Sequence, residues 1–118
     1  MSGNWYQVTD KGDLNGNYLE ASGTAMITYA IAKGVELKFL PAKYKKYAQK
    51  GFSGLVDQMI SVKPDTNVIT LENVCRVAGL GGSPYRDGSF EYYLSEPIRP
   101  NDAKGVGPFI MAAHFLDQ

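Results

Sequence analysis

The sequence is poor in the residues that build metal sites and disulfides. Among its 118 residues there is one cysteine, Cys75, and one histidine, His114. A single cysteine forms no internal disulfide, and one cysteine with one histidine does not supply the ligands of a zinc site. We therefore expect no structural metal and no disulfide framework.

Excess charge and long apolar runs are also missing. Twelve Lys and Arg residues balance twelve Asp and Glu residues, so the sequence lacks the basic excess of a nucleic-acid-binding protein. No apolar run approaches the roughly 20 residues that cross a bilayer, and the first residues have neither the basic start nor the apolar run of a signal peptide, so we expect no export signal among them. We expect one domain at most, no nucleic acid and no membrane among its partners, and a cytoplasmic location is favoured.

The pattern of apolar and turn residues predicts a mainly helical chain with a small hairpin. Helices are expected at residues 23–32, with Ser22 as N-cap and a possible extension to Pro41, and at residues 41–60. A third is expected at residues 104–116, capped by Asn101 or Asp102. Two short β-branched runs, 68–71 and 74–77, are expected to pair with each other, and the glycine-rich residues 79–88 to form an irregular loop.

Two of these helices have an amphipathic pattern. In the second, Lys43, Lys46 and Lys50 lie opposite the apolar stripe, which is typical of an ordinary solvated face. The residues expected to be buried in the last helix are Val106, Phe109, Ile110, Ala113 and Leu116.

Several kinds of catalytic site fit the sequence poorly. The glycine-rich loop has Pro84 where a dinucleotide fingerprint needs glycine, and it lacks the Gly-Lys-Ser/Thr ending of a phosphate-binding loop. His114, near the end of a helix, is expected to be structural. Cys75 lies in an apolar run and is expected to be a small buried residue, although neighbouring Arg76 leaves an activated thiolate open as an alternative.

Carboxylates close to aromatic residues are the remaining candidates, because glycosidases use Asp or Glu as proton donor and base. Asp87 and Glu96 are examples, and each also has a plain structural explanation. Asp87 fits a turn, and Glu96 before a proline fits a pair with a nearby cation. The acidic residues are Asp10, Asp13, Glu20, Asp87, Glu91 and Glu96, and the aromatic residues are Trp5, Tyr6, Tyr18, Tyr85, Tyr92 and Tyr93.

Three segments, in order, resemble a known family. They read GNWYQVTD, NYLEASGTAMITYAIAKGV and VCRVAGLGGSPYRDGSFEYYLSEPIRPNDAKGVGPFIMAA. Together they resemble the C-terminal part of the unsaturated rhamnogalacturonyl hydrolases, glycoside hydrolase family 105, which is related to the unsaturated glucuronyl hydrolases of family 88. The resemblance implies the C-terminal portion of an (α/α)6 barrel, with residues 1–118 as a single partial domain. Residues 68–95 would then cover one mouth of the barrel's cleft.

The resemblance also implies a reaction. In this family an Asp protonates the C4=C5 double bond of an unsaturated uronic acid and water is directed to C5, which gives a hemiketal that opens and releases the next sugar. No metal or organic cofactor is required. The family's acid Asp and its Trp-Ala-Arg-Gly-like motif lie upstream of the residues present here, so we expect this chain alone to lack the proton donor.

The expected partner is an unsaturated uronic-acid oligosaccharide. Arg86 is a candidate for pairing with the uronate carboxylate, and the alternative is a salt bridge to Asp87, Glu91 or Glu96. A noncatalytic carbohydrate-binding module and an inactive truncated product are the other hypotheses. We also expect the exposed face of an incomplete barrel to favour self-association. The candidate sugar-binding residues are Trp5, Gln7, Glu20, Ser22, Tyr85, Arg86 and Asp87.

Overall fold

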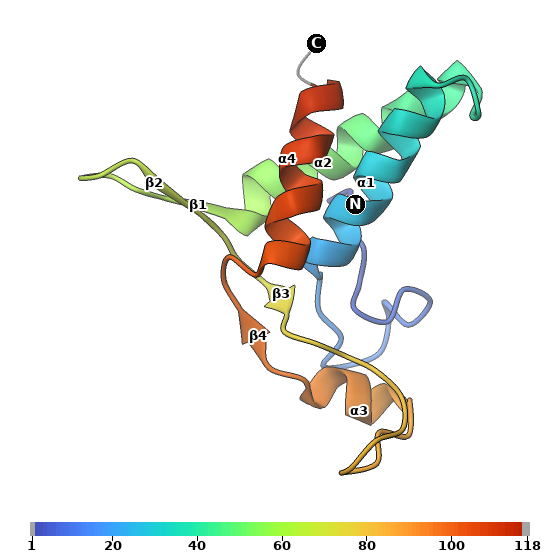
Figure 1. Cartoon of the computed structure of the whole chain (residues 1–118), viewed down its shortest axis with the longest axis vertical. Helices are drawn as coiled ribbons and strands as arrows, with labels where there is room; N and C mark the ends of the chain where they lie inside the picture. The colour runs from blue at the N-terminus through green and yellow to red at the C-terminus, as the bar shows by residue number, and fades with distance from the viewer. Residues whose placement is uncertain (1, 117–118) are drawn as a thin grey trace.

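The computed structural model describes residues 2–116 and is mainly helical (Figure 1). None of its helices is long and apolar enough to span a membrane. The helical elements are α1 (Ala21–Glu36), the 3-10 turn η1 (Ala42–Tyr44), α2 (Lys45–Met59), α3 (Phe90–Ser95) and α4 (Ala103–Leu116). The strands are β1 (Ile60–Lys63), β2 (Val68–Leu71), β3 (Val74–Cys75) and β4 (Ile98–Arg99).

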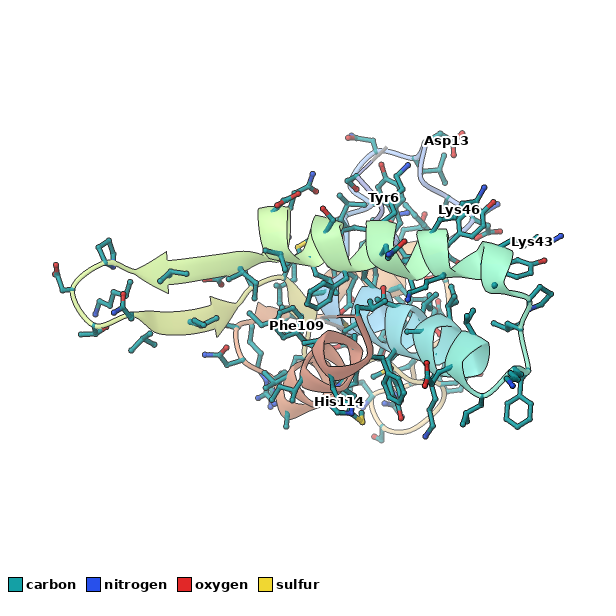
Figure 2. All side chains as sticks on the ribbon, turned by 90° about the horizontal axis from the view of Figure 1, so that it is seen from above. Tyr6, Asp13, Lys43, Lys46, Phe109 and His114 are labelled. Carbon is teal, nitrogen blue, oxygen red and sulfur yellow. The ribbon has the colours of Figure 1, made fainter. Side chains whose placement is uncertain are left out.

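Helix α1 packs against both α2 and α4, and the three helices surround the core (Figure 1). Between α4 and α2, the rings of Phe109 and Phe52 stack with their centroids 5.5 Å apart (Figure 2). Burial of such apolar surface is the main stabilising contribution here. The buried core residues are Ala21, Ala25, Leu55, Met59, Leu71 and Val74, with Val106 and Phe109 packed against them.

The N-terminal segment lies directly against α2 because two glycines leave room for it. A Cβ atom on Gly51 would lie 3.0 Å from the Trp5 ring. A Cβ on Gly54 would lie 2.5 Å from the Ser2 carbonyl oxygen. The amide of Asn4 donates a hydrogen bond to the Gly54 carbonyl, 3.1 Å away, and this contact helps to hold the segment in place.

The strand pairing differs from the sequence-based prediction. Strand β1 pairs antiparallel with β2, with Val62 opposite Ile69, and β3 pairs with β4. The expected hairpin of residues 68–71 with 74–77 is therefore wrong. The hairpin turn lies at residues 64–67, while Asn73, at a φ of 56°, turns the chain into β3. The Asn73 carbonyl then accepts a hydrogen bond from Ala21 N–H (2.9 Å), which ties this corner to α1.

The helix predictions are largely confirmed, with corrections at the ends and on one face. Helix α1 begins at Ala21 and is capped by Glu20, so Ser22 is not the N-cap, and the helix ends at Glu36 well before Pro41. In α4, Ile110 is exposed rather than buried. The short helix α3, which follows the irregular loop, was not predicted.

The cap of α4 is one of the two residues expected. The Asp102 carboxylate accepts a hydrogen bond from Lys104 N–H at 3.1 Å, as an N-cap side chain does. The same carboxylate accepts a bond from Arg99 Nε at 2.7 Å. The contact between Asp102 and Arg99 thus joins β4 to the start of α4.

Candidate functional site

A short antiparallel pairing places the first candidate residues beside the start of α1. Tyr6 pairs with Leu19 across an isolated bridge. On either side of it, Gln7 N–H donates to the Tyr18 carbonyl at 2.8 Å, and Glu20 N–H donates to the Trp5 carbonyl at 2.9 Å. The intervening loop 8–17 is therefore closed at its base, and the side chains of residues 5–7 are fixed next to α1.

Four of the candidate residues line one pocket of about 230 Å³. They come from the N-terminal segment and from the start of α1: Trp5, Gln7, Glu20 and Ser22. Tyr93 from α3, one of the aromatic residues noted near the carboxylates in the sequence, and Lys104 from α4 also line the pocket. No local pattern marked Lys104, because only the tertiary fold brings α4 to this position. We call this cavity the Trp5 pocket.

Glu20 is buried at the base of the Trp5 pocket and accepts four hydrogen bonds. The donors are Ser22 N–H (3.1 Å), Ser22 Oγ (2.6 Å), Gly23 N–H (2.5 Å) and Cys75 N–H (2.9 Å). Three of these donors bond to Oε1 and Gly23 N–H bonds to Oε2, so both carboxylate oxygens hold the start of α1 and strand β3 in place. Glu20 and Ser22 therefore build the pocket.

Gln7 is held by its amide nitrogen. This nitrogen donates to the Cys75 sulfur at 3.2 Å and to the Tyr93 carbonyl at 3.3 Å. Within residues 2–116 no donor bonds to the Oε1 atom of Gln7, and Gln7 is one of the residues that line the pocket. An amide oxygen fixed in this way suits a sugar hydroxyl group.

Cys75 is buried, as expected from its apolar run. Burial raises the pKa of the nearby Tyr18 phenol, and Cys75 adds to that increase. The Lys104 ammonium group donates hydrogen bonds to the carbonyls of Cys75 and Arg76. Lys104 thus closes one side of the pocket and fastens β3 to α4.

The glycine-rich loop forms a separate cavity. Tyr85 and Arg86 line a pocket of about 440 Å³ together with Tyr92 and Glu96, and Asp87 lies outside it. The three loop candidates are therefore not brought to the Trp5 pocket. The backbones of Gly81 and Arg86 pair with each other through two hydrogen bonds and close the loop.

Arg86 holds this loop through main-chain carbonyls. Its Nε donates to the Gly81 carbonyl at 2.9 Å and its Nη2 to the Leu80 carbonyl at 3.1 Å. Within residues 2–116 it forms no salt bridge with an acidic side chain, so the salt bridge to Asp87, Glu91 or Glu96 is wrong. The closed loop brings its own carbonyl groups to the guanidinium, and these take the place of a carboxylate.

Asp87 in the loop and Glu96 at the end of α3 have structural partners. Asp87 accepts a hydrogen bond from Ser89 N–H at 2.9 Å, and this bond lowers the pKa of Asp87. Glu96 accepts from the Tyr92 hydroxyl at 2.5 Å, so its partner is a phenol rather than the expected cation. That bond raises the pKa of Tyr92. Among the residues described, no cluster of three or more His, Cys, Asp or Glu side chains is arranged to hold a metal ion.

The chain is similar to known proteins along nearly its whole length. Residues 1–115 match the family model described as Glycosyl Hydrolase Family 88. Two curated relatives are each 39% identical over 95% of this chain: a protein of Agrobacterium fabrum and the 24.9 kDa protein in the picA locus of Rhizobium radiobacter. The chain spans about half the length (50%) of each of them.

Solved structures match over almost the whole chain. A family 105 glycoside hydrolase from C. acetobutylicum is 50% identical, with a TM-score of 0.92 over 97% of this chain and 31% of its own. A possible family 105 member from Klebsiella pneumoniae is 27% identical, with a TM-score of 0.61 over 98% of this chain and 25% of its own. The expected fold class is therefore confirmed: the chain forms a section of the family's helical barrel.

Proposed function

Because this chain belongs to glycosyl hydrolase family 88, we propose that it forms the sugar-binding wall of an enzyme acting on unsaturated galacturonyl residues of pectin fragments. In this proposal residues 1–118 are one partial domain of the barrel. The observation that carries the proposal is the Trp5 pocket, where a fixed amide oxygen without a donor among residues 2–116 lies beside the only tryptophan of the sequence.

The proposed reaction is hydration of the C4=C5 double bond of the terminal sugar. A carboxylic acid gives its proton to the double bond, water adds at C5, and the proton that this water loses returns to the carboxylate. The resulting hemiketal opens and releases the neighbouring sugar. The acid is regenerated, so the reaction consumes one water and no other reactant.

In this reaction the chain's own residues bind and orient the sugar. The ring of Trp5 offers an apolar surface for one face of the sugar, and Gln7 Oε1 accepts a hydrogen bond from a sugar hydroxyl. Glu20 and Ser22 hold the start of α1 in place beneath them. Tyr85, Arg86 and Asp87 belong to the glycine-rich loop and do not line the Trp5 pocket. Their contact with the sugar stays a prediction.

The proton donor in this proposal comes from outside the chain. The oxygens of Glu20 already accept four hydrogen bonds, and Asp87 and Glu96 do not line the Trp5 pocket. The lowered pKa of Asp87 also keeps this carboxyl ionised at neutral pH, and an ionised carboxylate donates no proton. The chain alone is therefore expected to bind the sugar without converting it.

A noncatalytic carbohydrate-binding module is the second candidate, and the lack of a free carboxyl group among the described residues of the pocket favours it. The two candidates differ in what the complete barrel does. We expect the 118-residue chain to leave the double-bond absorbance of unsaturated galacturonyl-rhamnose constant. A complete barrel that includes these residues should abolish this absorbance. A complete barrel that binds this disaccharide and leaves the absorbance unchanged contradicts the enzyme and supports the module.

The role of Gln7 tests the site itself. Replacing Gln7 with Ala in the complete barrel removes one hydrogen bond to the bound sugar and should raise KM several-fold, roughly the effect of about 1 kcal/mol. Gln49, an exposed amide on α2 that does not line the Trp5 pocket, serves as the matched control for replacement by Ala. Equal kinetics for the Gln7→Ala and Gln49→Ala variants would remove Gln7 from the site.

A further inference from the structure

A second cavity lies on the other side of the N-terminal segment, against α2. It measures about 520 Å³, and Trp5, Tyr6 and Thr9 line both this cavity and the Trp5 pocket. From α2 it receives Tyr47 and Lys50. We call it the α2 groove. Because the α2 groove lies beside the Trp5 pocket, a ligand longer than one sugar unit can extend from one cavity to the other.

The turn η1 and helix α2, beside the α2 groove, carry unpaired positive charge. Lys43, Lys45, Lys46 and Lys50 are all exposed, and within residues 2–116 none of them forms a salt bridge. The first acidic residue after them is Asp57. Cations near a helix N-terminus oppose the helix dipole, so helix stability does not account for this cluster.

The other charges near the groove leave this positive character in place. Figure 2 shows Tyr6, Lys43, Lys46 and Asp13 on the same side of α2. Asp10 lines the groove but lies 3.8 Å from Lys11, which partly neutralises it. Asp13 is exposed on the loop above the groove. Lys50 lines the groove, and Lys46 lies beside it over the ring of Tyr47, another lining residue.

Aromatic rings in the groove supply the second part of a recognition site. Trp5, Tyr6 and Tyr47 line it, and the Lys46 ammonium lies 5.1 Å from the centre of the Tyr47 ring. Aromatic rings contact the apolar faces of sugars, while a nearby ammonium group pairs with a carboxylate. Rings and lysines side by side match a sugar chain that carries carboxylates.

We propose that the α2 groove is a second binding site, separate from the Trp5 pocket, for a saturated acidic oligosaccharide such as an oligogalacturonate. It rests on the proposed function in one respect, because both sites then bind parts of the same polymer. The groove needs no C4=C5 double bond in its ligand. The ligand's carboxylates pair with Lys46 and Lys50, and its sugar rings contact Tyr47 and Tyr6.

The test is calorimetric titration of the 118-residue chain with a saturated oligogalacturonate and with a neutral galactose oligomer of equal length. We expect binding of the acidic oligomer only, weakening as salt is added. In the double variant Lys46→Ala/Lys50→Ala its affinity should fall about five- to tenfold, as expected for the loss of two exposed charge pairs. Both substitutions lie on an exposed helix face, and circular dichroism verifies that the fold is kept.

Lys33 provides the matched control. Its ammonium lies 5.4 Å from the centre of the Tyr29 ring on α1, which repeats the lysine and tyrosine arrangement away from the groove. The Lys33→Ala variant should bind the acidic oligomer as the parent chain does. Equal losses in the two variants would show a general charge effect and overturn the proposal.

Three further results would overturn it: no binding of the oligogalacturonate, equal binding of the neutral oligomer, or tighter binding of a single-stranded oligonucleotide of the same charge. The last would identify a general polyanion surface. Binding of the unsaturated disaccharide, and its dependence on Gln7, report on the Trp5 pocket separately. A failure of the α2 groove is therefore distinguishable from a failure of the proposed function.

Discussion

The carboxylate of Glu20 accepts a hydrogen bond from the backbone N–H of Cys75, 2.9 Å away, and so joins the start of α1 to strand β3. The same oxygen accepts from Ser22, and the other oxygen from Gly23. One buried side chain thus caps a helix, anchors a strand and forms the base of the Trp5 pocket. Such a contact, across 55 positions in the chain, makes the pocket dependent on the whole fold.

Replacing Glu20 with Ala should destabilise the chain by about 2–3 kcal/mol, because the cap is lost and buried N–H groups lose their acceptor. Glu36→Ala removes the same negative charge at the other end of α1 and should lower the free energy of unfolding by about 0.5 kcal/mol or less. Urea unfolding followed by circular dichroism measures both. Similar losses in the two variants would contradict the anchoring role.

Asp102 should make stability depend on pH. Hydrogen bonds from Lys104 N–H and Arg99 lower the pKa of this carboxyl in the folded chain. A lowered pKa contributes stability above the unfolded value of about 4 and loses it as the pH falls through the folded value. The melting temperature of Asp102→Asn should therefore lie below that of the parent at neutral pH and approach it in acid. A constant difference down to the lowest pH would contradict this.

Arg86 should control the order of the glycine-rich loop. In the Arg86→Ala variant the carbonyls of Leu80 and Gly81 lose their donor, so amide hydrogen exchange in residues 79–88 should become faster. If Arg86 also contacts the uronate, the affinity of the complete barrel for the unsaturated disaccharide should fall in this variant. Unchanged affinity would remove Arg86 from the sugar site and leave it the role of ordering the loop, in a separate pocket.

Self-association is expected through the β1–β2 hairpin, which projects from the helices (Figure 1). Val62 and Ile69 face each other across this hairpin and are 53% and 62% exposed. Exposed apolar strands with free edges pair readily with other chains. Light scattering should show a mass that rises with concentration. The rise should be smaller for Ile69→Lys, and for Thr66→Lys in the exposed turn it should equal that of the parent chain. A monomer at all concentrations would contradict this prediction.

Periodicity in the sequence was enough to predict the three long helices. Apolar residues recur at helical spacing around Ala48 and Leu55, and this pattern depends only on which face is buried. The prediction of the strand pairing failed because residues 72–73 resemble a turn as strongly as residues 64–67 do. Tertiary contacts decided between them, since Glu72 N–H bonds to the Met59 carbonyl and the Asn73 carbonyl accepts from Ala21.

The candidate site was predictable only in part, and for a similar reason. Trp5 and Gln7 were singled out by their resemblance to a family segment, and Tyr93 was noted only as an aromatic residue near the carboxylates. No local signal placed Lys104 beside them. The role of Glu20 as an N-cap was missed because Ser22 is the commoner capping residue. Long-range hydrogen bonds, such as that between Glu20 and Cys75, leave no trace in residue spacing.

The most direct test of the account uses Trp5, the only tryptophan in the chain. Its fluorescence is followed while unsaturated galacturonyl-rhamnose is added, and the absorbance of the double bond is recorded in the same sample. The account predicts a saturable change in fluorescence with constant absorbance: the sugar binds in the Trp5 pocket, and no proton donor of this chain acts on it. Unchanged fluorescence, or loss of the double-bond absorbance, would contradict it.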